Sequence, residues 1–221
     1  MNRTREKIIA AALREFSTKG LAGARTESIA KRARVNQRMI FYCFGNKAGL
    51  YREVLRRKLA AKVAVIESDP LEDFASTLVT GYEATCADLD HVRMWQWESL
   101  ECEGHKIVAE EERRALLRTE IARIQRAQAR GDLPPDIEAE MLLLTRIALG
   151  AFPLVFPQLT RLATGLEPVD PKFRRRWAKC LRRLGPRIAP PRLARQETLQ
   201  PQNGGKAGMK QLREPSRASS T

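Results

Sequence analysis

The sequence contains few of the side chains that hold metals or cross-link small domains. It has two histidines, His91 and His105, and four cysteines, none of which forms a CxxC pair. Structural zinc sites and disulfide frameworks need several such ligands at short, regular spacings. We therefore expect reduced thiols, no metal centre and no cofactor.

Long hydrophobic runs are also missing. No stretch of 18 or more apolar residues occurs, so we expect no transmembrane helix. Residues 1–7 are charged and lack the apolar segment and cleavage site of a secretory signal. No convincing strand pattern and no Ser/His/Asp or Cys/His arrangement is present. The sequence thus predicts an all-α, cytoplasmic protein that is not an enzyme.

The positive charge of the chain, +14 overall, is unevenly distributed. Residues 1–52 contain 12 Lys/Arg and 3 Asp/Glu, residues 53–185 contain 21 of each, and residues 186–221 contain 7 and 2. A basic end on a neutral body is typical of a polyanion-binding domain joined to a carrier domain, although a solvated basic face gives the same composition. We predict a DNA-binding domain (1–52), a helical body (53–185) and a disordered basic tail (186–221).

Helical periodicity dominates the chain. A first helix over residues 4–19 should stop at Gly20, and Thr26 should cap a second helix. Asn36 can cap a short third helix over 37–43, and Asn46 can cap a long fourth helix that ends at 69–70. About six further helices follow. Their expected bounds are 71–88, 90–103, 105–130, 136–152, 153–164 and 171–184.

The second and third helices have the features of a helix-turn-helix, in which the later helix enters the DNA major groove. Ala30 and Ala33 are small enough for a close approach, and Val35 and Ile40 can fill the space between the helices. The outward face of the third helix can read bases, since Gln pairs with adenine and Arg with guanine. The candidate DNA-binding residues are Thr26, Gln37, Arg38, Met39, Phe41, Tyr42 and, for a phosphate, Lys47.

Three segments, 8–21, 26–33 and 35–50, resemble the first helix, the second helix, and the recognition helix with the following helix start, of the bacterial TetR family. Residues 164–184 also resemble the last helices of many members. The resemblance implies a homodimeric repressor that binds a palindromic operator and is released by a small-molecule ligand. It also implies that each subunit places one recognition helix in successive major grooves, about 34–36 Å apart.

Two residues depart from the family pattern. Arg34 stands where the family usually has glycine, and if the position requires a positive φ, arginine costs about 1 kcal/mol or more there. Cys43 replaces a tyrosine or histidine that often touches the DNA backbone, so one phosphate contact is missing. Oxidation of this thiol could weaken DNA binding, or Cys43 could simply be a small residue at a tolerant position.

One helix face in the body is a candidate ligand site. His91, Trp95, Glu98 and Cys102 lie at i, i+4, i+7 and i+11, with Met94 beside them. On one interpretation Glu98 holds a cationic ligand and Trp95 adds a cation–π contact. On the other the face belongs to the core, with Glu98 paired to an arginine of another helix. Further aromatic residues expected to line the same interior are Phe74, Tyr82, Phe152 and Phe156.

Residues 136–152 and 171–184 are the expected dimer interface. The first segment is apolar on nearly every side, and the second has a narrow apolar stripe through Phe173, Trp177 and Leu184. Two such helices from each subunit would form a four-helix bundle, although burial within one subunit would give the same pattern.

Two other functions compete with a specific repressor. A non-specific nucleoid or architectural DNA-binding protein would also have a basic end, but it would not need the base-reading face at residues 37–42. An enzyme with an accessory DNA-binding domain would need a catalytic arrangement that the sequence does not show. The sequence does not identify the effector, the operator or the regulated genes.

Overall fold

The computed structural model describes residues 2–68, 71, 73–101 and 107–190, without the side chains of 64–68. These residues form helices and no strand, which confirms the predicted all-α class. The helices are α1 (Asn2–Gly23), α2 (Thr26–Ala33), α3 (Arg38–Phe44), α4 (Lys47–Ser68), α5 (Phe74–Cys86), α6 (Leu89–Glu101), α7 (Glu110–Ala129), α8 (Ala139–Val155), α9 (Pro157–Thr164) and α10 (Pro171–Ile188).

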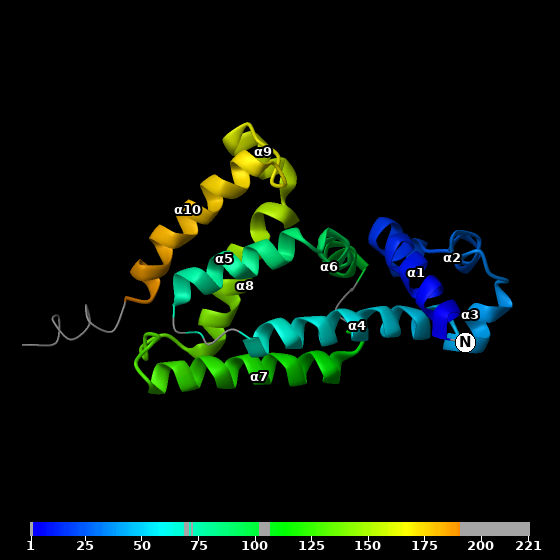
Figure 1. Cartoon of the computed structure of the whole chain (residues 1–221), viewed down its shortest axis with the longest axis horizontal. Helices are drawn as coiled ribbons and strands as arrows, with labels where there is room; N and C mark the ends of the chain where they lie inside the picture. Colours follow the sequence, from blue (N-terminus) through cyan, green and yellow to red (C-terminus); the bar gives the residue numbers. More distant parts are fainter. Residues whose placement is uncertain (1, 69–70, 72, 102–106, 191–221) are drawn as a thin grey trace, which may run out of the picture.

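The described chain has a small head and a larger helical body (Figure 1). Helices α1 to α3 and the start of α4 form the head around one apolar core, and α5 to α10 surround a second. Helix α4 runs from the head along α7 of the body. Its residues Tyr51, Val54 and Leu55 belong to the core of the head, so the boundary predicted at residue 52 falls inside this helix.

Helix α6 connects the two parts. It packs against α1 of the head and also contacts α8 and α5 of the body. Gly20, the predicted stop of the first helix, breaks the regular geometry of α1 with a φ of 69° and a ψ of −176°. The chain nevertheless resumes a helical turn as far as Gly23, because new hydrogen-bond acceptors from α6 receive its N–H groups.

Several predicted bounds need correction. Helix α6 begins at Leu89, α7 begins at Glu110, and α10 continues to Ile188, three residues into the predicted tail. The last extension is possible because Gly185 lies directly against Ala75 of α5, where a side chain would collide. The predicted tail beyond residue 190 lies outside the described residues.

Helices α8 and α9 meet at a sharp angle of 79°. Pro157 opens α9, where its missing N–H is not needed. Within the described residues no individual helix has the length and apolarity to cross a bilayer, although this bent pair satisfies the same test when its two helices are taken together.

Candidate DNA-binding interface and ligand site

Two asparagine side chains bind backbone N–H groups at the starts of the recognition helix α3 and of the following helix α4. The Asn36 carboxamide oxygen accepts the N–H of Arg38 at 2.9 Å, and the Asn46 oxygen accepts the N–H of Gly49 at 2.8 Å. The Asn46 bond agrees with the predicted cap of α4, whereas Gln37 occupies the N-cap position of α3 without a side-chain cap, and Asn36 binds Arg38 from one residue earlier. Ile40 is fully buried between the helices, so the outward face of α3 is fixed relative to the head.

The turn before α3 contains a residue in the left-handed conformation. Arg34 has a φ of 55° and a ψ of 49°, and its N–H donates to the carbonyl groups of Ala30 and Lys31. This arrangement closes α2 and lets Val35 turn back against the core of the head. The position where the family usually has glycine therefore does require a positive φ in this chain, and an arginine occupies it.

Four of the candidate DNA-binding residues are exposed on α3 or its first turn. Gln37 and Arg38 are exposed, and the side chains of Phe41 and Tyr42 are 45% and 72% exposed. Met39 is different, because it is half-buried and packs against the core of the head. Arg38 forms no ion pair within the described part of the chain, so its guanidinium is available to an acceptor.

Thr26 does not cap α2 as predicted. Arg25 occupies the N-cap position with extended backbone, and Thr26 is the first helical residue. The Thr26 hydroxyl instead accepts a hydrogen bond from the Gln37 amide nitrogen at 2.8 Å. This bond joins the start of α2 to the start of α3, so both side chains lie on the same surface as the recognition helix.

Two basic side chains brace this surface in a way that the sequence did not reveal. The Lys47 ammonium donates to the carbonyl oxygens of Ala22 and Ala24 at 3.0 and 3.1 Å. Arg5 donates to the Cys43 carbonyl at 2.8 Å and lies over the ring of Phe44. The cations therefore stabilise the ends of α1 and α3, which carry partial negative charge. Only their positive charge, and no residue spacing, hinted at this role.

The predicted ligand face on α6 forms around His91 and Trp95. Their rings meet edge to face with centroids 4.8 Å apart, and His91 is 4% exposed. The Lys62 ammonium of α4 lies 4.0 Å from the centre of the Trp95 ring. Sequence reasoning missed Lys62 because it lies on another helix, 33 positions away.

Burial changes the protonation of both basic groups on this face. Loss of hydration, followed by the positive charge of Lys62, lowers the pKa of His91 to about 3. Loss of hydration also lowers the pKa of Lys62 to about 8, against an opposing attraction from Asp88. At neutral pH His91 is therefore uncharged, whereas Lys62 keeps most of its positive charge.

Glu98 is already paired. Both of its carboxylate oxygens accept hydrogen bonds from the Arg113 guanidinium of α7, at 2.6 and 2.8 Å. This bidentate pair matches the second interpretation of the face, in which Glu98 pairs with an arginine of another helix. The pair has no net negative charge that could attract a cationic ligand. Cys102, the fourth residue of the predicted face, lies outside the described residues.

Met94 and Phe152 do not belong to this face. Met94 is buried in the core of the head, because it lies on the side of α6 that packs against α1. Phe152 is 46% exposed and contacts the ring of Phe156, also exposed, with centroids 5.1 Å apart. The inner face of α8 is formed by other residues, such as Leu142 and Leu154, so Phe152 points outward.

The opposite side of α6 is attached to the head. The Glu101 carboxylate accepts the N–H groups of Leu21 and Ala22 at 3.0 and 3.2 Å, directly after the break at Gly20. The ring of Trp97 lies against Gly20. One helix therefore contacts the His91–Trp95 face on one side and the first helix of the head on the other.

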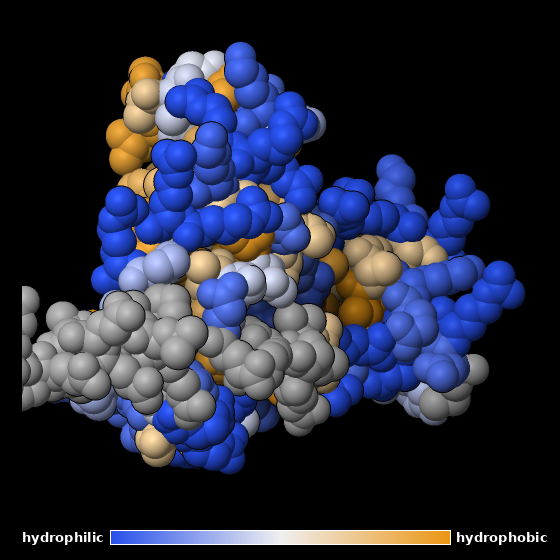
Figure 2. Space-filling view, turned by 60° about the vertical axis from the view of Figure 1, so that its left-hand side comes forward, coloured by the Kyte–Doolittle hydropathy of each residue, from blue (hydrophilic) through white to orange (hydrophobic). Residues whose placement is uncertain are grey.

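The two expected interface segments differ in how much apolar surface they expose. On α10, Phe173 and Leu181 are buried, and the Trp177 indole donates to the Leu149 carbonyl at 3.2 Å, so much of this stripe is used within the subunit. On α8, α9 and the loop that follows, large apolar side chains remain exposed, and Figure 2 shows part of this surface at the tip formed by α9. They are Met141, Leu144, Ile147, Phe152, Phe156, Leu159, Leu162 and Val169.

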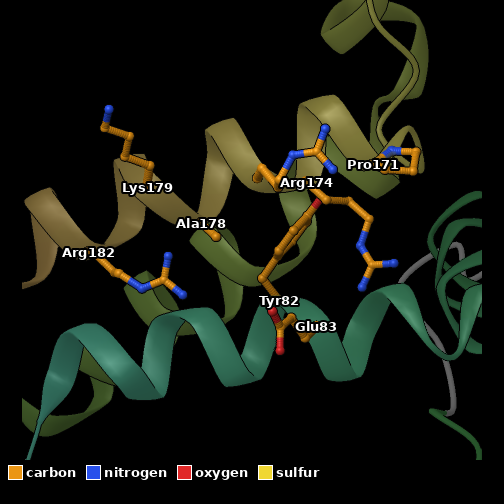
Figure 3. Close-up of a pocket in the computed structure, with 8 residues that line it drawn as sticks. Tyr82, Glu83, Pro171, Arg174, Ala178, Lys179 and Arg182 are labelled. Carbon is orange, nitrogen blue, oxygen red and sulfur yellow. The ribbon is translucent and has the colours of Figure 1, made fainter.

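An open basic pocket lies between α5 and α10 (Figure 3). Its volume is about 520 Å³, and its lining residues are Tyr82, Glu83, Pro171, Arg174, Arg175, Ala178, Lys179 and Arg182. Arg182 extends toward α5, whereas Lys179 points away from it. The pocket faces solvent, so its charges are largely screened.

Comparison with known proteins agrees with this architecture. Residues 8–54 match the family model described as bacterial regulatory proteins, tetR family, and residues 71–183 match the tetracyclin repressor-like C-terminal domain. The chain is 32% identical to the HTH-type transcriptional repressor SCO4008 of Streptomyces coelicolor over 164 residues, which cover 73% of this chain and 84% of that protein. It is 43% identical to the repressor NicS of Pseudomonas putida over 60 residues, 27% of this chain and 28% of that protein.

Solved structures show the same fold. The transcriptional regulator SCO4942 of S. coelicolor superposes with a TM-score of 0.70 at 26% identity, over 83% of this chain and 99% of that one. FadR of Bacillus subtilis, solved in complex with stearoyl-CoA, superposes with a TM-score of 0.59 at 13% identity, over 80% and 96%. The helix-turn-helix, the helical body and the matches to both family models lead to one conclusion: this chain belongs to the TetR family of bacterial DNA-binding transcriptional regulators.

Proposed function

We propose that this chain is a repressor that binds a palindromic operator as a homodimer and leaves it when a small molecule binds the body. The observation that carries the proposal is helix α6, whose two sides contact the His91–Trp95 face and the head. The protein would act in the bacterial cytoplasm, and no catalytic step is involved.

Sequence-specific binding follows from the exposed face of α3. Arg38 can donate two hydrogen bonds to guanine, and Gln37 can pair with adenine once its bond to Thr26 is exchanged. The Tyr42 hydroxyl can donate to a phosphate oxygen, while the ring of Phe41 can contact a thymine methyl group. Lys47 contributes positive charge at the start of α4, although two of its protons already serve backbone carbonyls.

Ligand release needs a connection between the body and the head. A ligand against Trp95 would displace Lys62 or α6, and α6 is bonded to the break in α1 through Glu101. Movement of α1 changes the angle of the head and therefore the spacing of two recognition helices in a dimer. An operator with a fixed half-site spacing would then no longer fit both subunits.

The homodimer is supported by the exposed apolar side chains of α8 and α9. An exposed apolar surface of this extent on one face is typical of a protein–protein contact. A two-fold axis through this surface would bring α8 of one subunit against α8 of its partner. Helix α10 would border the contact with the few apolar atoms that α5 leaves uncovered.

The proposal is tested by selecting genomic DNA fragments that the purified protein retains at about 150 mM salt, near physiological ionic strength. We expect one palindromic motif whose half-sites are separated by about one helical turn. Recovery of fragments without a common motif would contradict the proposal and favour the architectural alternative. A single unpaired half-site would retain specificity and contradict the homodimer.

A further inference from the structure

The interior around α4, α6 and α7 contains several charged side chains, and most of them are paired. Glu98 binds Arg113, and Lys58 binds Asp88 at 2.7 Å. Glu120 is buried and accepts hydrogen bonds from two arginines, Arg123 and Arg146. These interactions neutralise the carboxylates, so none of them requires a cation from outside.

Lys62 is the exception. Among the described residues its ammonium has no carboxylate within ion-pair distance, and its close neighbour is the ring of Trp95. A half-buried cation on an aromatic ring gains some electrostatic stabilisation, but less than from a carboxylate in the same place. Loss of hydration lowers the pKa of Lys62 to about 8, although the charge of Asp88 opposes this effect.

His91 has the same deficit beside the same ring. The His91 side chain is more than nine-tenths buried. Its Nδ1 has no hydrogen-bond partner among the described residues. Buried polar nitrogens normally have a partner, and an unpartnered one destabilises the fold. Lys62 and His91 therefore both contact the Trp95 ring, and each can donate a hydrogen bond to an acceptor there, His91 when Nδ1 carries its proton.

We propose that the effector is an organic monocarboxylate, held by Lys62 and His91, with an apolar body against Trp95. The inference rests on the proposed ligand-responsive function and names the chemical class of its ligand. The carboxylate oxygens accept from the Lys62 ammonium and, with the proton on Nδ1, from His91. One negative charge is expected because Lys62 is one cation without a paired carboxylate, whereas Arg113 binds Glu98, and Arg123 and Arg146 share Glu120.

The charge of this ligand is opposite to the charge suggested by Glu98 in the sequence. A cationic ligand would meet Lys62 on the face of Trp95, and like charges in a partly dehydrated site repel strongly. The structure also contains the open basic pocket on α10, where Lys179 and three arginines could attract any anion weakly. The experiment must therefore distinguish binding at Lys62 and His91 from binding at the basic pocket on α10.

The first experiment uses the full chain without DNA and two aromatic probes of opposite charge, benzoate and benzyltrimethylammonium. Heptanoate serves as an aliphatic carboxylate. We expect both carboxylates to raise the thermal unfolding midpoint in a saturable manner, and the ammonium compound to leave it unchanged. Lys62→Met should weaken carboxylate binding at least about tenfold, as loss of a charge-assisted contact does.

Lys179→Met is the matched control, since it removes a lysine of the open pocket and should leave carboxylate binding unchanged. Equal binding by Lys62→Met and the wild type, loss of binding in Lys179→Met, or no effect of either carboxylate at millimolar concentration would overturn the inference. Stabilisation by benzyltrimethylammonium instead of benzoate would overturn it as well.

A second measurement does not depend on the choice of probe. If Lys62 and His91 await a ligand, then Lys62→Met and His91→Phe should raise the unfolding midpoint of the ligand-free protein, because each removes a buried group without a partner. If both variants lower the midpoint or fail to fold, the two groups are structural and the inference is wrong.

Operator release separates this inference from the proposed function. Carboxylate binding that depends on Lys62 but leaves the DNA complex intact would support the ligand class and contradict ligand-induced release. Release by benzyltrimethylammonium, without any effect of benzoate, would support a ligand-responsive repressor and contradict the ligand class.

Discussion

Arg34 shows how a single residue can depart from a family pattern while the backbone keeps it. Its left-handed conformation closes α2 and directs Val35 into the head. An arginine in this conformation is less stable than glycine by about 1 kcal/mol. We therefore expect Arg34→Gly to increase the free energy of unfolding by about that amount, measured by urea denaturation.

Arg32→Gly provides the control for that variant, because Arg32 is also exposed but lies within the regular helix α2. There glycine should destabilise the protein by about 1 kcal/mol. Destabilisation by both substitutions would show that the Arg34 side chain makes a stabilising contact that outweighs its backbone strain.

His91 makes stability depend on pH. Its pKa is about 3 in the folded protein, whereas an unfolded chain has a histidine pKa near 6.5. As the pH falls from 7 to 5, His91 binds a proton in the unfolded chain but not in the folded protein, so the free energy of unfolding decreases. For one fully shifted histidine the loss is up to about 2 kcal/mol.

Urea denaturation at pH 7 and pH 5 measures this loss, and His91→Phe should reduce it. The charges nearest His91 belong to Lys62 and Lys58 of α4, Asp88 before α6 and Arg113 of α7, none of which is changed by the substitution. An acid-induced loss of the same size in His91→Phe would assign it to other groups.

Arg38 and Lys47 should affect DNA binding differently. Arg38 is exposed on α3, so Arg38→Ala should cost about 1–3 kcal/mol on the operator and relax the preference at one base pair. Lys47 braces the corner between α1 and α2, so Lys47→Ala should weaken binding to all sequences evenly. Binding titrations on the operator and on a scrambled duplex measure both, and an unchanged base preference in Arg38→Ala would exclude Arg38 from base reading.

At the scale of elements, the junction between α3 and α4 depends on Gly49. A Cβ at this position would lie well inside contact distance of the Phe44 carbonyl oxygen, which is part of the backbone at the end of α3. Gly49→Ala must therefore displace one helix against the other. We expect a loss of about 1–3 kcal/mol in unfolding free energy and weaker operator binding.

Ala48→Gly is the neighbouring control, because Ala48 is exposed in the same turn of α4 and its Cβ can be removed without a collision. It should change stability by about 1 kcal/mol or less and leave operator binding near that of the wild type. If Gly49→Ala binds DNA as tightly as Ala48→Gly, the angle between α3 and α4 is not critical for recognition.

At the scale of the whole molecule, assembly depends on the exposed surface of α8 and α9. Leu144 is 57% exposed on α8, and a glutamate there would place a charge in the proposed contact between subunits. Leu144→Glu should raise the dimer dissociation constant at least about tenfold in sedimentation experiments and weaken operator binding with it.

Leu117→Glu on α7 is the control, since Leu117 is also exposed but lies on a helix outside the proposed contact. It should leave the dimer intact. A dimer that survives Leu144→Glu but dissociates with a substitution on α10 would place the subunit contact on the helix that we assign mainly to the fold of one subunit.

The sequence by itself determined the features that arise from local chemistry. The helix-turn-helix, the Asn46 cap of α4 and the asparagine at the start of α3 each depend on neighbours within a few residues, so periodicity and family resemblance were sufficient. The apolar character of α8 on nearly every side was also evident from composition, although only the structure shows that Met141, Leu144 and Ile147 are exposed.

The tertiary structure decided which distant side chains meet. Helical spacing correctly placed His91 and Trp95 on one face, but it could not show that Arg113 neutralises Glu98 or that Lys62 covers Trp95. It also could not show that Met94 belongs to the head, because that depends on α6 packing against α1. Ion pairs and burial depend on how helices pack rather than on spacing along one helix. For this reason the sequence suggested a cationic ligand at Glu98, whereas the structure led us to propose a carboxylate at Lys62.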